Sequence, residues 1–186
     1  MNSVPDIIDA KELEQKKIFL ILASPGTIRE RNIEIIREIS TRGYHTVVIT
    51  TNFPYSVLSK LYVQSGISLG SVSFIDAVTR NSIGSAENIP GVVRYINNPA
   101  NLTDMGIAVT EVLKDQSGKK VCIMYDSVST MLIYLSSANI SKFVHFVTNK
   151  LRLMDVSGIF LAVEKGLDPM LMTQLTTFVD TVVDTG

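Results

Sequence analysis

Residues 18–39 read IFLILASPGTIRERNIEIIREI, and this stretch decides the fold class. Six apolar residues, Ile18 to Ala23, come first without polar alternation, which is typical of a strand buried on both faces of a sheet. Residues 24–27 then break the strand, and isoleucines at positions 28, 35, 36 and 39 follow on one face of a helix. A buried strand, a turn and an amphipathic helix in this order predict an α/β protein.

The same alternation continues along the chain. Further strands are predicted at residues 46–51, 72–76, 121–126, 158–163 and 181–184, and further helices at residues 55–64, 102–117, 140–154 and 168–178. Strands separated by helices imply right-handed crossovers. We therefore expect a three-layer α/β/α sandwich with a mostly parallel central sheet. Residues 79–98 are predicted to form a long loop with a short strand near residues 92–96, and long loops are often functional.

Size and composition indicate one domain. The chain has 186 residues, of which 46% are hydrophobic and 19% charged, and domains typically span about 100–200 residues. We expect residues 1–16 to form a polar segment or a short helix and residues 17–186 to form the domain. The N-terminus lacks the apolar core of a signal peptide, and no apolar stretch approaches the ~20 residues of a membrane span. We therefore expect a cytoplasmic protein without a membrane partner.

Charge and chemistry exclude several function classes. The 17 basic and 18 acidic residues give a net charge of −1, which argues against a nucleic-acid surface. The single cysteine, Cys122, lies in a predicted buried strand, so we expect it to serve packing rather than nucleophilic chemistry. His45 opens a strand and His145 lies on the exposed face of a predicted helix, which disfavours Ser/His/Asp catalysis. No metal-ligand spacing is present.

Ligands of parallel α/β sheets bind beyond the carboxyl ends of the strands. The first such place is the turn after residues 18–23, where a phosphate-binding loop of the pattern G-x-x-x-x-G-K-[ST] would lie. Alignment of Gly26 inside that loop puts Ala23 and Ile28 at the two glycine positions, Arg29 at the lysine and Glu30 at the Ser/Thr. A β-branched Ile28 disfavours a phosphate cradle, and Glu30 lacks the hydroxyl that holds Mg²⁺.

Two interpretations of this turn follow. A nucleotide would contact Ser24, Pro25, Gly26, Thr27 and Arg29; otherwise these residues form a plain turn between strand and helix, which the departures from the pattern favour. In a plain turn Arg29 is a surface residue, and we expect it to pair with Glu30, Glu34 or another acidic neighbour.

The second place is Asp126, at the end of the buried strand 121–126. A carboxylate at this position holds magnesium in nucleoside triphosphatases. Alternatively, Asp126 or Ser127 caps the next helix, and position alone favours the cap. No carboxylate lies between His45 and Ile75, so a water-activating glutamate after the second strand is missing. We predict no catalytic residue.

The order of these elements resembles the RecA-like ATPases, and specifically their KaiC-like branch, which is widespread in archaea. The resemblance spans residues 17–186. It rests on five segments: residues 18–26 in the phosphate-loop position, 121–129 in the Walker B position, 143–152 as the helix after Walker B, and the segments 73–77 and 98–104. It implies the RecA-like sandwich and assembly into homo-oligomers, whereas hydrolysis is not implied because only Asp126 of the essential set is present.

Three functions follow as hypotheses. The first is a non-catalytic regulatory or protein-interaction module without a cofactor, whose partner is a copy of itself or another protein. The second is an unconventional nucleotide-binding protein or weak ATPase that holds ATP with Mg²⁺ through Arg29 and Asp126. The third is a small-molecule enzyme, which would require a pocket near Asn52, Asp76 and Asp126.

Overall fold

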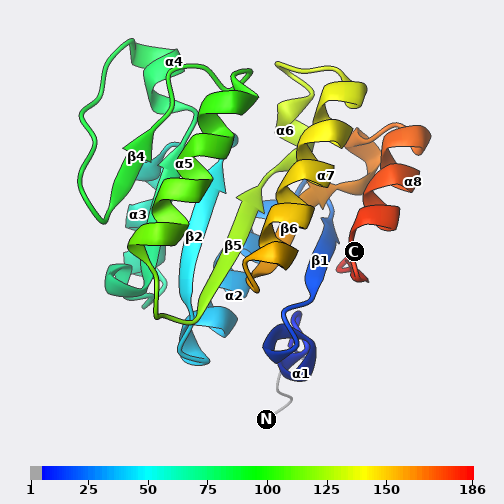
Figure 1. Cartoon of the computed structure of the whole chain (residues 1–186), viewed down its shortest axis with the longest axis horizontal. Coiled ribbons are helices and arrows are strands. Elements are labelled where there is room, and N and C mark those ends of the chain that lie inside the picture. Colours follow the sequence, from blue (N-terminus) through cyan, green and yellow to red (C-terminus); the bar gives the residue numbers. More distant parts are fainter. Residues whose placement is uncertain (1–5) are drawn as a thin grey trace.

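The computed structural model describes residues 6–186 (Figure 1). Seven parallel strands form one sheet in the order β4-β3-β2-β5-β6-β1-β7. The strands are β1 (Ile18–Ala23), β2 (His45–Thr50), β3 (Val72–Asp76), β4 (Val93–Tyr95), β5 (Val121–Asp126), β6 (Ser157–Val163) and β7 (Thr181–Asp184). Almost every residue of β1, β2, β3, β5 and β6 is buried, as expected for a sheet covered on both faces.

The helices cover both faces of this sheet. They are α1 (Ala10–Glu14), α2 (Ile28–Thr41), α3 (Tyr55–Gln64), α4 (Thr79–Ile83), α5 (Leu102–Asp115), α6 (Val128–Met131), α7 (Ser137–Leu153) and α8 (Pro169–Phe178), with 3-10 turns at Leu69–Ser71 and Glu164–Gly166. In Figure 1, α5, α7 and α8 lie in front of the sheet, and α2 and α3 lie behind it. One buried cluster joins α5, α6, α7 and α8 to the sheet, and a second joins α1, α2 and α3 to its other face. The predicted three-layer α/β/α sandwich is confirmed.

Residues 1–5 of the N-terminal segment lie outside the described residues. The following residues are held against α2, because the Glu38 carboxylate accepts hydrogen bonds from the backbone N–H groups of Ile7 (2.8 Å) and Ile8 (3.0 Å). Ile8 and Leu13 are fully buried beneath the helices of this face. The N-terminal segment, for which we expect either a polar segment or a short helix, contains the short helix α1.

The predicted long loop is wrong for its first residues, which form helix α4. The cause is Asp76 at the end of β3, whose Oδ1 accepts hydrogen bonds from the backbone N–H groups of Val78 (2.7 Å) and Thr79 (2.8 Å). These bonds satisfy amides that a helix start leaves open. Five residues are too few to show a helical period in the sequence. The short strand expected near residues 92–96 is confirmed as β4.

Arg80 of α4 holds the rest of this segment in place. Its Nε and Nη2 donate hydrogen bonds to the carbonyl oxygen of Ala86 (2.9 and 2.8 Å). Its Nη1 donates to the carbonyl oxygen of Tyr95 and to Oδ1 of Asn97, both at 3.1 Å. The guanidinium also lies 5.7 Å from the centre of the Tyr95 ring. One side chain thus ties α4, the loop and the edge strand β4 together.

We expect Arg80→Ala to increase the rate of subtilisin cleavage within residues 84–98 by about tenfold or more, which corresponds to about 1.4 kcal/mol of easier local opening. The reason is that the loop loses its anchoring hydrogen bonds while the sheet core is untouched. Cleavage sites are mapped by mass spectrometry. Arg37→Ala, which removes an exposed arginine with one hydrogen bond to the Ser65 carbonyl, is the control and leaves the rate unchanged. Equal rates for Arg80→Ala and the wild type would contradict the anchoring role.

No helix among residues 6–186 combines the length and the apolar character that crossing a membrane requires.

Candidate functional site

Asp126 is the centre of a buried polar cluster at the carboxyl end of β5. Its side chain is 1% exposed. Its Oδ2 accepts a hydrogen bond of 2.7 Å from Nδ2 of Asn32, and its Oδ1 accepts one of 3.3 Å from Nδ2 of Asn52. Asn32 lies in the second turn of α2, and Asn52 follows β2. Both carboxylate oxygens are therefore engaged by amide groups from neighbouring elements.

Tyr62 of α3 extends this cluster. Its hydroxyl donates a hydrogen bond of 2.6 Å to Oδ1 of Asn32. Asn32 thus accepts from Tyr62 on one side and donates to Asp126 on the other, and all three side chains are at most 1% exposed. Buried polar groups of this kind need such partners, because an unsatisfied one costs about 1–3 kcal/mol.

Burial dominates the proton equilibria of the cluster. It raises the pKa of Asp126 from 3.8 to about 6, and the hydrogen bonds from Asn32 and Asn52 oppose this rise. It also raises the pKa of Tyr62 well above its ordinary value, with a further contribution from the nearby Asp126 charge. Tyr62 is therefore a protonated donor at any physiological pH.

Analysis of the sequence did not identify Asn32. A signal was present, however, because Asn32 lies at helical spacing between Ile28 and the buried Ile35, Ile36 and Ile39 of α2. A polar residue inside an apolar stripe needs a buried partner. The sequence shows the need for a partner, but it does not show that the partner is Asp126.

Ser127, rather than Asp126, caps the helix that follows β5. The Ser127 side chain accepts from the backbone N–H of Thr130, the first turn of α6. Thr130 Oγ1 in turn lies 2.8 Å from Oγ1 of Thr51, which follows β2. Of the two capping candidates, the structure selects Ser127, and Asp126 faces the asparagines instead.

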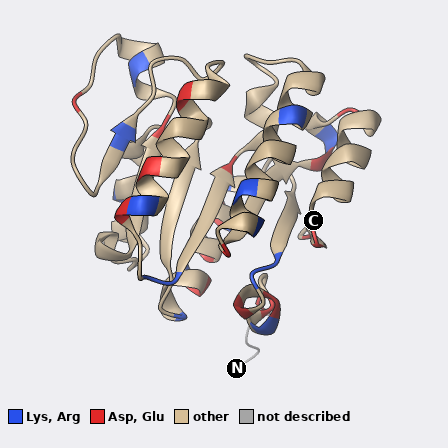
Figure 2. Ribbon diagram, in the orientation of Figure 1, with Lys and Arg blue, Asp and Glu red and all other residues tan. Residues whose placement is uncertain are grey.

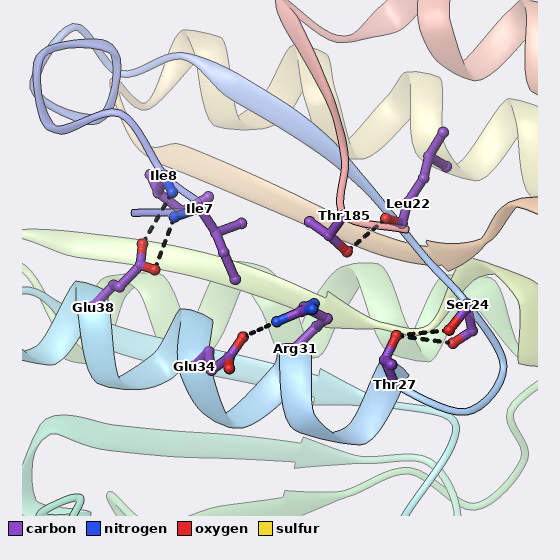
Figure 3. A network of polar contacts seen from close by, with 9 residues as sticks. All are labelled: Ile7, Ile8, Leu22, Ser24, Thr27, Arg31, Glu34, Glu38 and Thr185. Carbon is purple, nitrogen blue, oxygen red and sulfur yellow. Dashed lines mark hydrogen bonds and ion pairs between the residues drawn. The ribbon is translucent and has the colours of Figure 1, made fainter. Parts of the chain in front are cut away.

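The turn at the phosphate-loop position is short and closes on itself (Figure 3). Only four residues separate β1 from α2. The backbone N–H groups of Thr27 and Ile28 both donate to the carbonyl oxygen of Ser24 at 3.1 Å, and the Ser24 and Thr27 hydroxyls lie 2.8 Å apart. Gly26 adopts no positive φ. Two amides at the helix start therefore point back into the turn.

Arg29 is exposed in the first turn of α2, as expected. The expected ion pair with Glu34 is wrong: Glu34 pairs with Arg31 (Figure 3). Residues three apart on a helix lie on the same side, which favours Arg31 over Arg29. Among residues 6–186, Arg29 forms no ion pair.

The three residues proposed to line an enzyme pocket do not form one group. Asn52 donates to Asp126, whereas Asp76 accepts from the backbone N–H of Tyr55 (2.8 Å) and from those of Val78 and Thr79 at the start of α4. Asp76 is fully buried and all its contacts are structural. The carboxylates of Asp76 and Asp126 thus lie at the ends of different strands and accept hydrogen bonds from different groups.

The remaining reactive side chains are also accounted for. Burial raises the pKa of Cys122 to about 12, so its thiol is protonated and packs in the core. His45 is buried and its Nε2 lies 2.8 Å from Oγ of Ser73. His145 is exposed on α7, beside Asn149. Within residues 6–186, no group of three or more His, Cys, Asp or Glu side chains is placed to hold a metal.

Two solved structures share the fold of this chain. An uncharacterized Pyrococcus horikoshii protein, solved in complex with an unknown peptide, matches with a TM-score of 0.72 and 13% identity, over 92% of this chain and 78% of that chain. A KaiC-like protein from the same hyperthermophilic archaeon matches with a TM-score of 0.66 and 15% identity, over 91% of this chain and 73% of that chain. These likenesses confirm the predicted RecA-like architecture.

Sequence comparison gives the family. No curated protein matches the chain. Residues 25–185 match a family of unknown function, DUF7504. The match begins inside the turn after β1 and ends just beyond β7, so it spans nearly the whole sheet. The chain therefore belongs to the DUF7504 family.

Proposed function

We propose that this protein is a non-catalytic KaiC-like domain that acts as a regulatory module through contacts with other protein chains, including copies of itself, and that it does not hydrolyse ATP. The proposal rests on the burial and the hydrogen bonding of Asp126. The carboxylate that would hold magnesium is buried, and amide N–H groups of Asn32 and Asn52 occupy both of its oxygens. A cation at this carboxylate would have to compete with both amide donors.

The turn after β1 supports the same proposal. A phosphate cradle depends on several backbone N–H groups that face the ligand. Here the N–H groups of Thr27 and Ile28 are already bonded to Ser24. The Ser24 and Thr27 hydroxyls bond to each other instead of facing outward. The peptide in the Pyrococcus horikoshii relative supports protein contacts as one use of this fold.

One observation favours the alternative, an unconventional nucleotide-binding protein. Arg29 is exposed at the start of α2 and has no ionic partner among residues 6–186. A cation at a helix N-terminus opposes the helix dipole, so its presence there requires a reason. Under this alternative, Arg29 would contact the phosphates and Asp126 would hold Mg²⁺.

Nucleotide titration separates the two functions. We expect the thermal unfolding of the wild type to be unchanged by millimolar ATP and Mg²⁺, because the turn offers no phosphate cradle. Arg29→Ala behaves in the same way, and Arg37→Ala, which removes an exposed arginine elsewhere on α2, is the matched control.

A nucleotide at about 100 times its dissociation constant stabilises a protein by about 2.7 kcal/mol. The alternative would be established if the wild type is stabilised by that amount, Arg29→Ala binds the nucleotide at least about tenfold more weakly, and Arg37→Ala binds it as the wild type does. Release of phosphate by the wild type would overturn the non-catalytic assignment.

A further inference from the structure

An apolar groove of about 450 Å³ lies between α5 and α7, on the face of the sheet away from α2. Its volume falls in the range of about 300–1,000 Å³ typical of ligand sites. It is lined by Leu102, Thr103, Gly106, Ile107, Thr110, Lys142, Phe143 and Phe146. In Figure 1 both helices lie in front of the sheet, and β5 is visible between them.

The groove carries apolar side chains that the domain leaves half exposed. Ile107 on α5 is 47% exposed, and Phe146 on α7 is 49% exposed. Gly106 lets the Phe146 ring approach the α5 backbone, since a Cβ at position 106 would lie 3.2 Å from Cε1 of that ring. Ile107 and Phe146 therefore leave apolar side-chain surface open to a partner along the groove.

The charge around the groove is positive on the α7 side. Helix α7 contains no acidic residue, and Figure 2 shows basic but no acidic bands along it. Lys142 lines the groove, and Nζ of Lys150 lies 5.8 Å from the centre of the Phe146 ring. On the α5 side, Glu111 is ion-paired with Arg94, and Asp104 accepts a hydrogen bond of 2.7 Å from Nδ2 of Asn101. The cations beside the apolar surface are therefore available to an anionic partner.

The backbone around the groove decides the shape of that partner. Both walls are helices, whose N–H and C=O groups bond within each helix. An extended peptide would find no backbone partners there and would bury unpaired polar groups. A helix satisfies its own backbone and presents side chains at i, i+3, i+4 and i+7.

We propose that the α5–α7 groove docks an amphipathic helix of another protein, whose apolar stripe contacts Ile107 and Phe146 and whose flanking Glu or Asp residues face Lys142 and Lys150. This inference rests on the proposed function, for which it names the class of partner.

A displayed peptide library tests the proposal on the full chain. Its members are helices of about 18 residues, or five turns, with Leu, Ile, Phe or Met along one stripe and Glu, Gln or Lys varied on both flanks. We expect selection on the wild type to enrich Glu over Lys at the flank that faces α7. Selected peptides, made synthetically, should bind at least about tenfold more weakly to Ile107→Glu and lose affinity with added salt.

Two further variants sharpen the result. Lys142→Glu together with Lys150→Glu should reverse the preference from Glu to Lys, which a change in folding cannot do. Val63→Glu, at a 59% exposed valine on α3, is the matched control and leaves binding unchanged. Circular dichroism checks that each variant is folded.

Several outcomes would overturn the proposal. These are no enrichment on the wild type, equal binding to Ile107→Glu, a dimer of the chain that Ile107→Glu dissociates, and binding of anionic vesicles through the groove in preference to peptide. ATP hydrolysis would overturn the proposed function but would leave a measured peptide affinity standing, so the two failures are distinguishable.

Discussion

Replacement of Asn32 by alanine is expected to lower the free energy of unfolding by about 3 kcal/mol at pH 7.5. The change leaves two buried groups without a hydrogen-bond partner, Oδ2 of Asp126 and the hydroxyl of Tyr62. Each such group costs about 1–3 kcal/mol, and more when it is charged. Urea unfolding of the wild type and Asn32→Ala measures the loss.

The same loss is expected to shrink when the pH falls to 5. The Asn32 hydrogen bond lowers the pKa of Asp126, so its removal raises that pKa above about 6. The carboxyl group of the variant then becomes protonated at a higher pH and escapes part of the cost of a buried charge. Asn149→Ala, at an exposed position on α7, is the control, with an expected change within about 0.5 kcal/mol. A loss for Asn32→Ala below about 1 kcal/mol at pH 7.5, or equal losses at both pH values, would contradict this account.

Asp126→Asn is expected to stabilise the protein by about 2 kcal/mol at pH 8. A pKa raised from 3.8 to about 6 means that the folded state resists ionisation of this group. The neutral carboxyl group of Asp126 contributes its full stabilisation of the folded state below pH 3.8, and this contribution is lost as the pH rises through about 6. The full loss corresponds to about 3 kcal/mol. An asparagine remains neutral at every pH and can still accept from Asn32. Its NH2 group can donate to Asn52 once the Asn52 amide turns its oxygen toward it, so most of this loss is avoided.

The pH profile of Asp126→Asn is the decisive readout. The stability difference between the two proteins should be near zero at pH 4 and grow up to pH 7. His45, whose pKa is lowered by burial and by Lys119, contributes stability above its ordinary pKa that is lost at lower pH. This contribution is common to both proteins and cancels in the difference. Asp115→Asn, at an exposed site at the end of α5, is the control for the change in charge. Destabilisation by Asp126→Asn at pH 8 would show that the carboxylate is a favourable, ionised part of the fold.

The main secondary structure followed from the sequence because its signals are local. The apolar stretch Ile18–Ala23 and the isoleucine spacing of α2 predicted the first strand and helix, and Tyr55–Gln64 and Val121–Asp126 were predicted with the bounds observed. A helix or strand that is buried on one or both faces has a local pattern of apolar residues. This pattern can be recognised without knowing which distant residues it contacts. Helix α4 was missed because a helix of five residues is too short to show a period, and the hydrogen bonds from its first amides to Asp76 stabilise it instead.

The candidate site was only half predictable. Asp126 was found from its position at the end of a buried strand, and the turn after β1 from its place before α2. The hydrogen bonding of Asp126 was not predictable, because Asn32 and Asp126 are 94 residues apart in the chain and meet only through the crossovers of the sheet. Whether two groups form a hydrogen bond depends on differences of a few tenths of an ångström in the distance between donor and acceptor, and tertiary packing sets that distance.

The sequence by itself determined that this protein is a parallel α/β sandwich with a carboxylate at the end of a buried strand, since apolar periodicity and strand length are properties of neighbouring residues. Only the tertiary structure decided that the carboxylate is enclosed by Asn32 and Asn52 and that α5 and α7 leave an apolar groove between them. Each of these depends on which side chains packing brings into contact, and contact between distant residues leaves no period in the chain.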